Sequence, residues 1–286
     1  MADAAVRRAA RDRALLPAAG HRSRGAAPAM ILEVRDLAVR FGGVTAVGGV
    51  SFGVAAGTVT SLIGPNGAGK TTAFNVITGF QRPTAGGVMH DGTTITGWRP
   101  HRIAARGLVR TFQKTSLFPG LSVHENVLTG LHLRGRVGFV AALLRRGRVG
   151  AEERALDDEA ERVIGFVGLG ARRETLASAL PYGEQRLLEL AVALAARPRL
   201  LLLDEPGSGM TISEKSALAA LIQRVRDDGI TVFLVEHDMR LVMGISDRVL
   251  VLNYGRLIAD GSVTEVQRDP EVIRAYLGTG ATRERA

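Results

Sequence analysis

The stretch that most constrains the fold is "GPNGAGKTT" at residues 64–72. It follows the apolar run "VTSLI" and leads into "KTTAFNVITGF", which has helical spacing, so we expect a strand, a loop and a helix. Its glycines allow backbone N–H groups to turn towards phosphate oxygens, and the helix adds the positive end of its dipole. The spacing G-x-x-x-x-G-K-[ST] therefore predicts a phosphate-binding loop. A glycine-rich turn with a surface lysine is the alternative, which is disfavoured because the chain has only three lysines.

The predicted loop assigns a task to each of its polar residues. We expect Lys70 to bridge the β- and γ-phosphates of a nucleotide and the Thr71 hydroxyl to ligate Mg²⁺. The residues predicted to contact the nucleotide here are Gly64, Pro65, Asn66, Gly67, Ala68, Gly69, Lys70, Thr71 and Thr72.

Two later apolar runs, "LLLLDE" (200–205) and "TVFLVEHD" (231–238), are typical of parallel strands buried on both faces. Both end in acidic or histidine residues, where an open α/β sheet places its ligand crevice. We expect Asp204 to hold the hydration shell of Mg²⁺ and Glu205 to orient or deprotonate the attacking water, with His237 near the γ-phosphate. Alone, such residues are more often helix caps or surface groups, but the phosphate loop favours a functional interpretation.

The rest of the chain indicates an α/β core with an insertion. Short strands are predicted at the front, beginning with "ILEVRDLAVRF", and residues 248–261 are typical of a hairpin that turns at 253–255. Between about 114 and 182 the pattern becomes helical, without a strong strand. We therefore predict a helical lobe inserted into an α/β core.

Composition excludes several classes. Without cysteine the chain has neither disulfides nor thiolate metal sites, which fits a reducing compartment. The net charge is +9, but residues 1–29 hold six arginines and two aspartates, and the remaining charge does not indicate nucleic-acid binding. This segment lacks the apolar region of a secretory signal, so we expect a disordered basic extension, with translation from Met30 as an alternative. No apolar run reaches the roughly 18 residues of a membrane span, so a membrane role would need a partner.

Together these features resemble the nucleotide-binding subunit of ATP-binding-cassette (ABC) transporters, over residues 31 to 277. Phe41 stands 23 residues before Gly64, where the family places an aromatic that stacks on adenine. The remaining matches are Gln113 in "RTFQ" (the Q-loop), "PYGEQ" at 181–185 (the signature), Asp204-Glu205 and His237 (the switch histidine).

The resemblance implies an α/β fold: a P-loop NTPase (RecA-like) core with an N-terminal antiparallel β subdomain and an inserted helical subdomain. It places the ATP-binding core at 30–113 and 183–286 and the insert at 114–182, ending at the signature.

The resemblance also implies roles for residues outside the phosphate loop. Gln113 would act in catalysis and as a Mg²⁺ ligand. Tyr182, Gly183 and Gln185 would contact the γ-phosphate held by a second subunit, so that two ATP molecules are sandwiched in a head-to-tail dimer that closes on binding and opens after hydrolysis. Ordinary helix capping is the alternative for 180–191.

The signature departs from the family's usual L-S-G-G-Q at Tyr182 and Glu184. The following "EPGSGMTISE" has Thr211 near the place of the D-loop's usual Asp or Asn, and Thr211 to Glu214 fits a capping box.

Several stretches are similar to the branched-chain amino-acid importer branch: "RFGGVTAV", "GLVRTFQ", "YGEQRLLELA", "EHDMRLVMGISDRV" and "DPEVIRAYLG". This implies integral-membrane permease subunits, a second ATP-binding subunit (identical or paralogous) and, indirectly, an external substrate-binding protein as partners, with no nucleic acid. The subunit would lie at the cytoplasmic face of the membrane, held by the permease.

Other functions stay open as alternatives. Urea or amide uptake and lipid export belong to related ATPases. Soluble ABC proteins of DNA repair or translation carry coiled-coil insertions or two cassettes, which this chain lacks. A hydrolysis-dead switch is disfavoured because Glu205 and His237 are both present.

Two segments of the insert carry weaker predictions. Leu117, Phe118 and Leu121 are expected to be exposed as a socket for a coupling helix of the permease, and local packing is the alternative. Residues 134–149, which mix arginine with apolar residues, are interpreted as a solvated insert rather than a lipid-facing segment.

Overall fold

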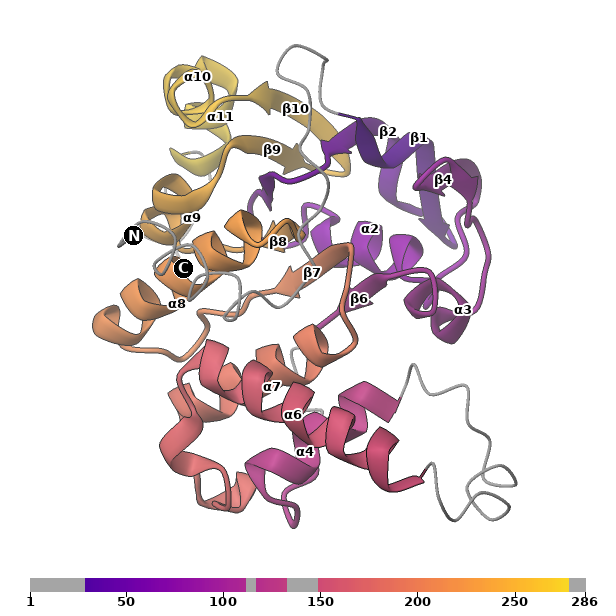
Figure 1. Ribbon diagram of the computed structural model, residues 1–286. Helices are drawn as coiled ribbons and strands as arrows, with labels where there is room; N and C mark the ends of the chain where they lie inside the picture. The colour runs from indigo at the N-terminus through magenta and orange to yellow at the C-terminus, as the bar shows by residue number, and fades with distance from the viewer. Residues whose placement is uncertain (1–28, 112–116, 133–148, 278–286) are drawn as a thin grey trace, which may run out of the picture. The chain divides into compact units, whose positions relative to one another are not determined.

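The computed structural model describes residues 29–111, 117–132 and 149–277 (Figure 1). The described residues form two compact units: one within 114–198, and one made of 25–113 with 199–286. The predicted extension at the N-terminus and nearly all of 134–149 lie outside the described residues. The predicted insert, 114–182, falls within the first unit, which runs on to Pro198 and includes helix α7 (Tyr182–Ala195), packed against the other helices of that unit.

An antiparallel sheet opens the larger unit. Its strands lie in the order β2-β1-β4-β5, with bounds Val44–Ala55, Met30–Phe41, Ala85–His90 and Thr93–Thr94. Apolar side chains of β1, such as Leu32 and Val34, are buried. This agrees with the predicted N-terminal β subdomain.

A six-stranded sheet forms the centre of the same unit. Its order is β10-β9-β3-β8-β7-β6, with bounds Arg256–Gly261, Arg248–Asn253, Val59–Ile63, Thr231–Val235, Leu200–Asp204 and Leu108–Arg110. All pairs are parallel except β9 with β10, which form the predicted hairpin. Strands β3, β7 and β8 are buried throughout, as expected for parallel strands covered on both faces.

The register of these strands brings three chain segments to one edge. Leu62 of β3 and Asp204 of β7 both pair with Val235 of β8. Because the strands are parallel, the residues that follow each strand emerge side by side at the carboxyl edge. Gly64, Glu205 and Glu236 are therefore neighbours by topology.

Helices cover this sheet. The bounds in the larger unit are α2 (Lys70–Ile77), α3 (Pro100–Ala104), α8 (Ile212–Asp227), α9 (Met239–Ile245), α10 (Val263–Arg268) and α11 (Pro270–Leu277). Phe74 of α2 packs on Phe233 of β8, with ring centroids 4.9 Å apart, and Phe52 of β2 lies 5.7 Å from Phe233. Thr211 caps α8 in the predicted capping box with Glu214.

The smaller unit is helical. It holds α4 (Val123–His132), α6 (Val149–Val167), α7 and two short 3-10 turns at Gly170–Arg172 and Ala177–Ala179. The three α-helices pack against one another pairwise. In the parts of the chain that the structure describes, no helix combines the length and apolar character needed to cross a membrane.

The predicted socket is only partly exposed. Phe118 is 54% exposed, whereas Leu117 and Leu121 are half-buried. The expectation that all three residues are exposed is therefore wrong for the two leucines. Leu121 lies in a segment whose main chain bonds to the turn at 176–178: its own carbonyl accepts from Ala177, and the Pro119 carbonyl accepts from Ser178.

Replacing Phe233 tests how much the core between the two sheets and α2 contributes to stability. We expect Phe233→Ala to lower the free energy of unfolding by about 3–5 kcal/mol, because the cavity removes the contacts with Phe74 and Phe52. Urea denaturation followed by circular dichroism measures this. Phe41→Ala is the control, since the Phe41 side chain is exposed, and a change of more than about 1 kcal/mol there would contradict the assignment of the core.

Candidate functional site

The loop after β3 has a backbone that only glycine fits at two positions. Gly64 has a φ of 148°, and a Cβ there would lie 2.0 Å from the carbonyl oxygen of Leu252. Gly69 has a φ of 102°, and its Cβ would lie 2.4 Å from the carbonyl oxygen of Ala46. Main-chain carbonyls of β9 and β2 thus lie so close to the loop that neither position can carry a side chain.

Lys70 lies over this loop. Its side chain is nearly buried, and Nζ donates to the carbonyl oxygens of Gly64 (2.6 Å) and Pro65 (3.0 Å). Burial lowers the pKa of Lys70, while the charges of Glu205 and Asp204 oppose that shift. The ammonium is therefore close enough to both carboxylates to interact with them across the loop.

Other loop residues present their polar groups outward. Asn66, Gly67 and Thr71 are exposed, Thr72 is half-buried, and Ala68 is buried. The turn between β9 and β10 also holds the loop, because the N–H of Gly255 donates to the Ala68 carbonyl oxygen (3.0 Å).

Phe41 ends β1 at a hairpin turn and is 51% exposed. It pairs with Val44, two residues before Ala46, whose carbonyl lies against Gly69. The predicted adenine-stacking residue is thus an exposed aromatic on a hairpin that touches the phosphate loop.

Asp204 ends β7 and is buried in an ion pair. Its Oδ2 accepts from Arg110 Nη2 at 2.6 Å, and the two side chains are 2% and 7% exposed. Asp204 Oδ1 is also buried, and it accepts no hydrogen bond from any residue that the structure describes. A buried carboxylate oxygen without a donor is costly unless a cation or water faces it.

Glu205 and His237 face one another beyond the strand ends. His237 Nδ1 lies 3.9 Å from Glu205 Oε2, and the histidine is more exposed than the glutamate. Glu205 has a φ of 48°, an unusual value for a residue other than glycine, and its N–H donates to the Val235 carbonyl at 2.8 Å. Strained backbone of this kind often accompanies functional positions.

Glu236 joins the two loops that carry these residues. Its side chain is 1% exposed, and Oε1 accepts from the N–H of Gly207 at 2.8 Å. Oε2 accepts from the N–H groups of His237 (3.0 Å) and Asp238 (3.3 Å). One carboxylate therefore fixes the loop after Glu205 and the loop that carries His237.

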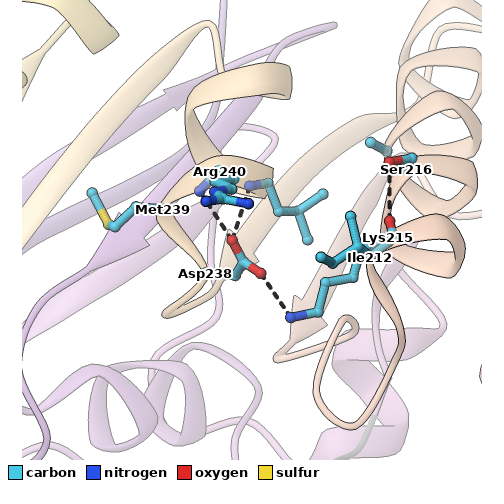
Figure 2. A pocket seen from close by; sticks show the side chains of 8 residues that line it. Ile212, Lys215, Ser216, Asp238, Met239 and Arg240 are labelled. Carbon is cyan, nitrogen blue, oxygen red and sulfur yellow. Dashed lines mark hydrogen bonds and ion pairs between the residues drawn. The ribbon is translucent and has the colours of Figure 1, made fainter.

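Asp238, which follows His237, anchors the same loop to α8. Its Oδ1 accepts from the N–H groups of Arg240 and Leu241 at the start of α9, and its Oδ2 accepts from Lys215 Nζ at 2.7 Å (Figure 2). The hydrogen bond from Lys215 holds the pKa of Asp238 below its usual range. These residues line a pocket of about 360 Å³ together with Ile212, Ser216, Ala219 and Met239.

The signature residues belong to the helical unit. Pro181 is the N-cap of α7, Gly183 is buried, and no side chain of the described residues caps the helix start. Gln185 Nε2 donates to the Leu180 carbonyl at 2.9 Å, so this side chain closes the turn before the helix.

Two arginines hold the unusual signature side chains. The Tyr182 hydroxyl accepts from Arg186 at 2.6 and 3.0 Å, and the guanidinium also lies over the tyrosine ring. Arg172 pairs with Glu184 at 3.0 Å, which neutralises a carboxylate in the first turn.

The predicted residues thus fall into three groups. Phe41, residues 64–72, Asp204, Glu205 and His237 belong to the larger unit, where Lys70 and the last three meet at one edge of the sheet; Tyr182, Gly183 and Gln185 belong to the other unit; and Gln113 lies outside the described residues.

Sequence reasoning missed Arg110, Glu236 and Tyr276. Tyr276 of α11 packs on a cluster that contains Ile63, and its hydroxyl lies close to the main chain of Gly64. Burial raises the pKa of Tyr276 to about 12, so the phenol stays neutral near neutral pH. All three lie inside stretches that carry the family resemblance, "GLVRTFQ", "EHDMRLVMGISDRV" and "DPEVIRAYLG", but the resemblance implied no role for them.

Replacing Glu236 tests whether its carboxylate holds both loops. Glu236→Gln turns an NH₂ group towards at least one backbone N–H, so we expect a loss of about 1–3 kcal/mol in the free energy of unfolding. Amide hydrogen exchange at Gly207 and His237 should also become faster. Glu33→Gln, which breaks an exposed pair with Arg35, is the control. Unchanged exchange at both amides would disprove the bridging role.

Comparisons with known proteins show which family this chain is similar to. Residues 47–208 match the family model "ABC transporter", and residues 256–282 match "Branched-chain amino acid ATP-binding cassette transporter". The high-affinity branched-chain amino acid transport ATP-binding protein BraF of Pseudomonas aeruginosa is 45% identical, over 87% of this chain and 98% of its own. LivG of Escherichia coli, described in the same words, is 41% identical over the same shares.

A solved structure extends the likeness to the fold. The crystal structure of the ADP conformation of MJ1267, an ATP-binding cassette of an ABC transporter, has a TM-score of 0.77 and 31% identity, over 87% of this chain and 99% of that chain. These matches cover most of the chain and include the phosphate loop with strands β3 and β7. They establish that the chain belongs to the ABC transporter family of ATP-binding cassettes.

Proposed function

We propose that this chain is the ATP-binding and ATP-hydrolysing subunit of a membrane importer for branched-chain or other hydrophobic amino acids. The observation that carries the proposal is the meeting of Lys70, Asp204, Glu205 and His237 at the carboxyl edge of β3, β7 and β8. This edge supplies a cation for phosphate oxygens and a carboxylate for a water molecule.

Each of these side chains has a part in hydrolysis. Lys70 draws the β- and γ-phosphate oxygens onto the loop amides. Glu205 takes a proton from water while the water oxygen bonds to the γ-phosphorus, and the bond to the β–γ bridging oxygen breaks, with its electrons leaving on ADP. His237, 3.9 Å from Glu205, contacts the γ-phosphate and the carboxylate together.

The residues present fit a magnesium ion. Asp204 Oδ1 is a buried oxygen without a donor among the described residues, and Thr71 presents an exposed hydroxyl at the start of α2. Asp204, Thr71 and Gln113 would hold Mg²⁺ or its water shell, and the ion would neutralise charge on the phosphate oxygens. Phe41 offers its exposed ring to adenine.

A second cassette would complete the site. The start of α7 leaves its first N–H groups without a side-chain cap among the described residues, and Gly183 allows close approach to an anion. Arg172 removes the repulsion that Glu184 alone would exert on a phosphate. Tyr182, Gly183 and Gln185 would thus face the γ-phosphate held by the second cassette, and ATP would close the dimer.

The transport assignment rests on the relatives and on the tail. BraF and LivG are named as branched-chain amino acid transport proteins, and residues 256–282 match a model of that name. The helical unit would dock the permease at the cytoplasmic face of the membrane, where exposed Phe118 and Leu176 offer apolar contacts. Urea, amide or lipid transport remains the alternative within the family.

Replacing Glu205 tests the catalytic assignment. We expect Glu205→Gln to keep ATP binding, to reduce turnover by at least about 100-fold and to trap a dimer, because the amide cannot accept the water's proton. Phosphate release and light scattering measure these effects. Lys70→Ala should instead weaken ATP binding itself. Hydrolysis at the wild-type rate by Glu205→Gln would refute its role as the base.

Transport by the reconstituted complex tests the substrate class. With its permease and binding protein in vesicles, the chain should support uptake of leucine, isoleucine and valine that depends on internal ATP. Urea, amides and lipids serve as competing substrates in the same assay. Uptake of urea or amides without that of branched-chain amino acids would overturn the assignment while leaving the ATPase intact.

A further inference from the structure

Arg110 occupies a position that the proposed mechanism does not use. It is the last residue of β6, three residues before Gln113, and its guanidinium is almost completely buried. Nη2 donates to Asp204 Oδ2 at 2.6 Å, and Nη1 donates to Asn75 Oδ1 (2.8 Å) and Thr78 Oγ1 (3.2 Å).

These acceptors come from two different elements. Asp204 ends the strand that leads to Glu205, whereas Asn75 and Thr78 belong to the last turn and the C-cap of α2, which begins at Lys70. The same guanidinium lies 5.7 Å from the ring centroid of Phe74. One side chain thus connects β6, β7 and the phosphate-loop helix.

The two oxygens of Asp204 consequently differ. Oδ2 is held by Arg110, and Oδ1 is left buried without a donor from the described residues. We propose that Arg110 is a positioning residue for the metal site: it fixes the Asp204 carboxylate so that Oδ1 faces Mg²⁺ and its water shell. This inference rests on the proposed function, because it assigns the metal to ATP hydrolysis.

An arginine suits this task better than a lysine. Its planar fork reaches Asp204 with one nitrogen and α2 with another, whereas an ammonium presents a point charge. Without Arg110, the Asp204 carboxylate loses the donor that fixes Oδ2 and is free to turn. Oδ1 then no longer presents an oriented lone pair to the ion.

The proposed role of Arg110 affects metal binding and not the binding of the nucleotide itself. The loop amides and Lys70 contact phosphates without Asp204, so loss of Arg110 should weaken the Mg²⁺-dependent part of the affinity alone. A purely structural role would instead weaken nucleotide binding equally with and without the metal, and would act through overall stability.

The experiment uses the full chain and a fluorescent ATP analogue, titrated in EDTA and over a series of Mg²⁺ concentrations. For Arg110→Gln we expect the affinity in EDTA to stay within about twofold of wild type, while the Mg²⁺ concentration for half-maximal effect rises by about tenfold or more. For Arg110→Lys this Mg²⁺ concentration should rise by less, because lysine keeps the positive charge but loses the planar guanidinium. Asn75→Ala removes one hydrogen bond between Arg110 and α2. It should also raise the Mg²⁺ concentration for half-maximal effect.

Controls make the result decisive. Arg248→Gln breaks an ion pair with Asp260 on the β9–β10 hairpin and should leave the Mg²⁺ dependence unchanged. If Arg110→Gln does not fold, as judged by its thermal midpoint, the comparison of Arg110→Lys with wild type carries the test. Mg²⁺ dependence at the wild-type value in both folded Arg110 variants would overturn the positioning role alone. A wild-type chain whose affinity ignores Mg²⁺ would overturn the metal site and this role together.

Discussion

Parallel pairing of β3, β8 and β7 is the constraint on which the rest of the site depends. Because Leu62 and Asp204 share Val235 as their partner, the phosphate loop, the Asp204–Glu205 pair and the His237 loop leave the sheet together. A shift of one residue would also turn each strand's side chains to the opposite face. Because both faces of these strands are packed, such a shift would misplace core side chains such as Phe233, so the packing of the core fixes the positions of the chemical groups.

Each carboxylate at this edge of the sheet lies near a cationic side chain or backbone N–H groups. Arg110 neutralises Asp204, three backbone N–H groups surround Glu236, and Lys70 lies within the field of two carboxylates. Buried carboxylates are tolerated only with such partners. The groups assigned to the reaction, Glu205 and His237, are more exposed than the groups that support them. Rigid support behind accessible reactive groups is the arrangement that catalysis requires.

The sequence could predict the fold class and the three strands that lead into the site, β3, β7 and β8, because apolar runs, turn residues and the phosphate-loop spacing are local signals. It could not predict Arg110, Glu236 or Tyr276, whose roles depend on partners far away in the chain, such as Asp204 for Arg110. It also misjudged Leu117 and Leu121, since a loop's burial depends on the segment that packs against it. Local patterns thus locate the reactive residues, and only the folded chain shows what holds them.

The tail illustrates how branch-specific sequence can reach the shared site. Residues 256–282 match a separate model from the cassette core, yet Tyr276 within them lies close to Gly64, the first glycine of the phosphate loop. The Gly64 carbonyl accepts from Lys70, while Leu252 closes on its Cα. Gly64 is therefore in contact with three parts of the chain: Lys70, the central sheet and the C-terminal helix α11. A tail fixed in this way belongs to the framework of the phosphate loop, so changes in α11 should act on nucleotide binding through Gly64.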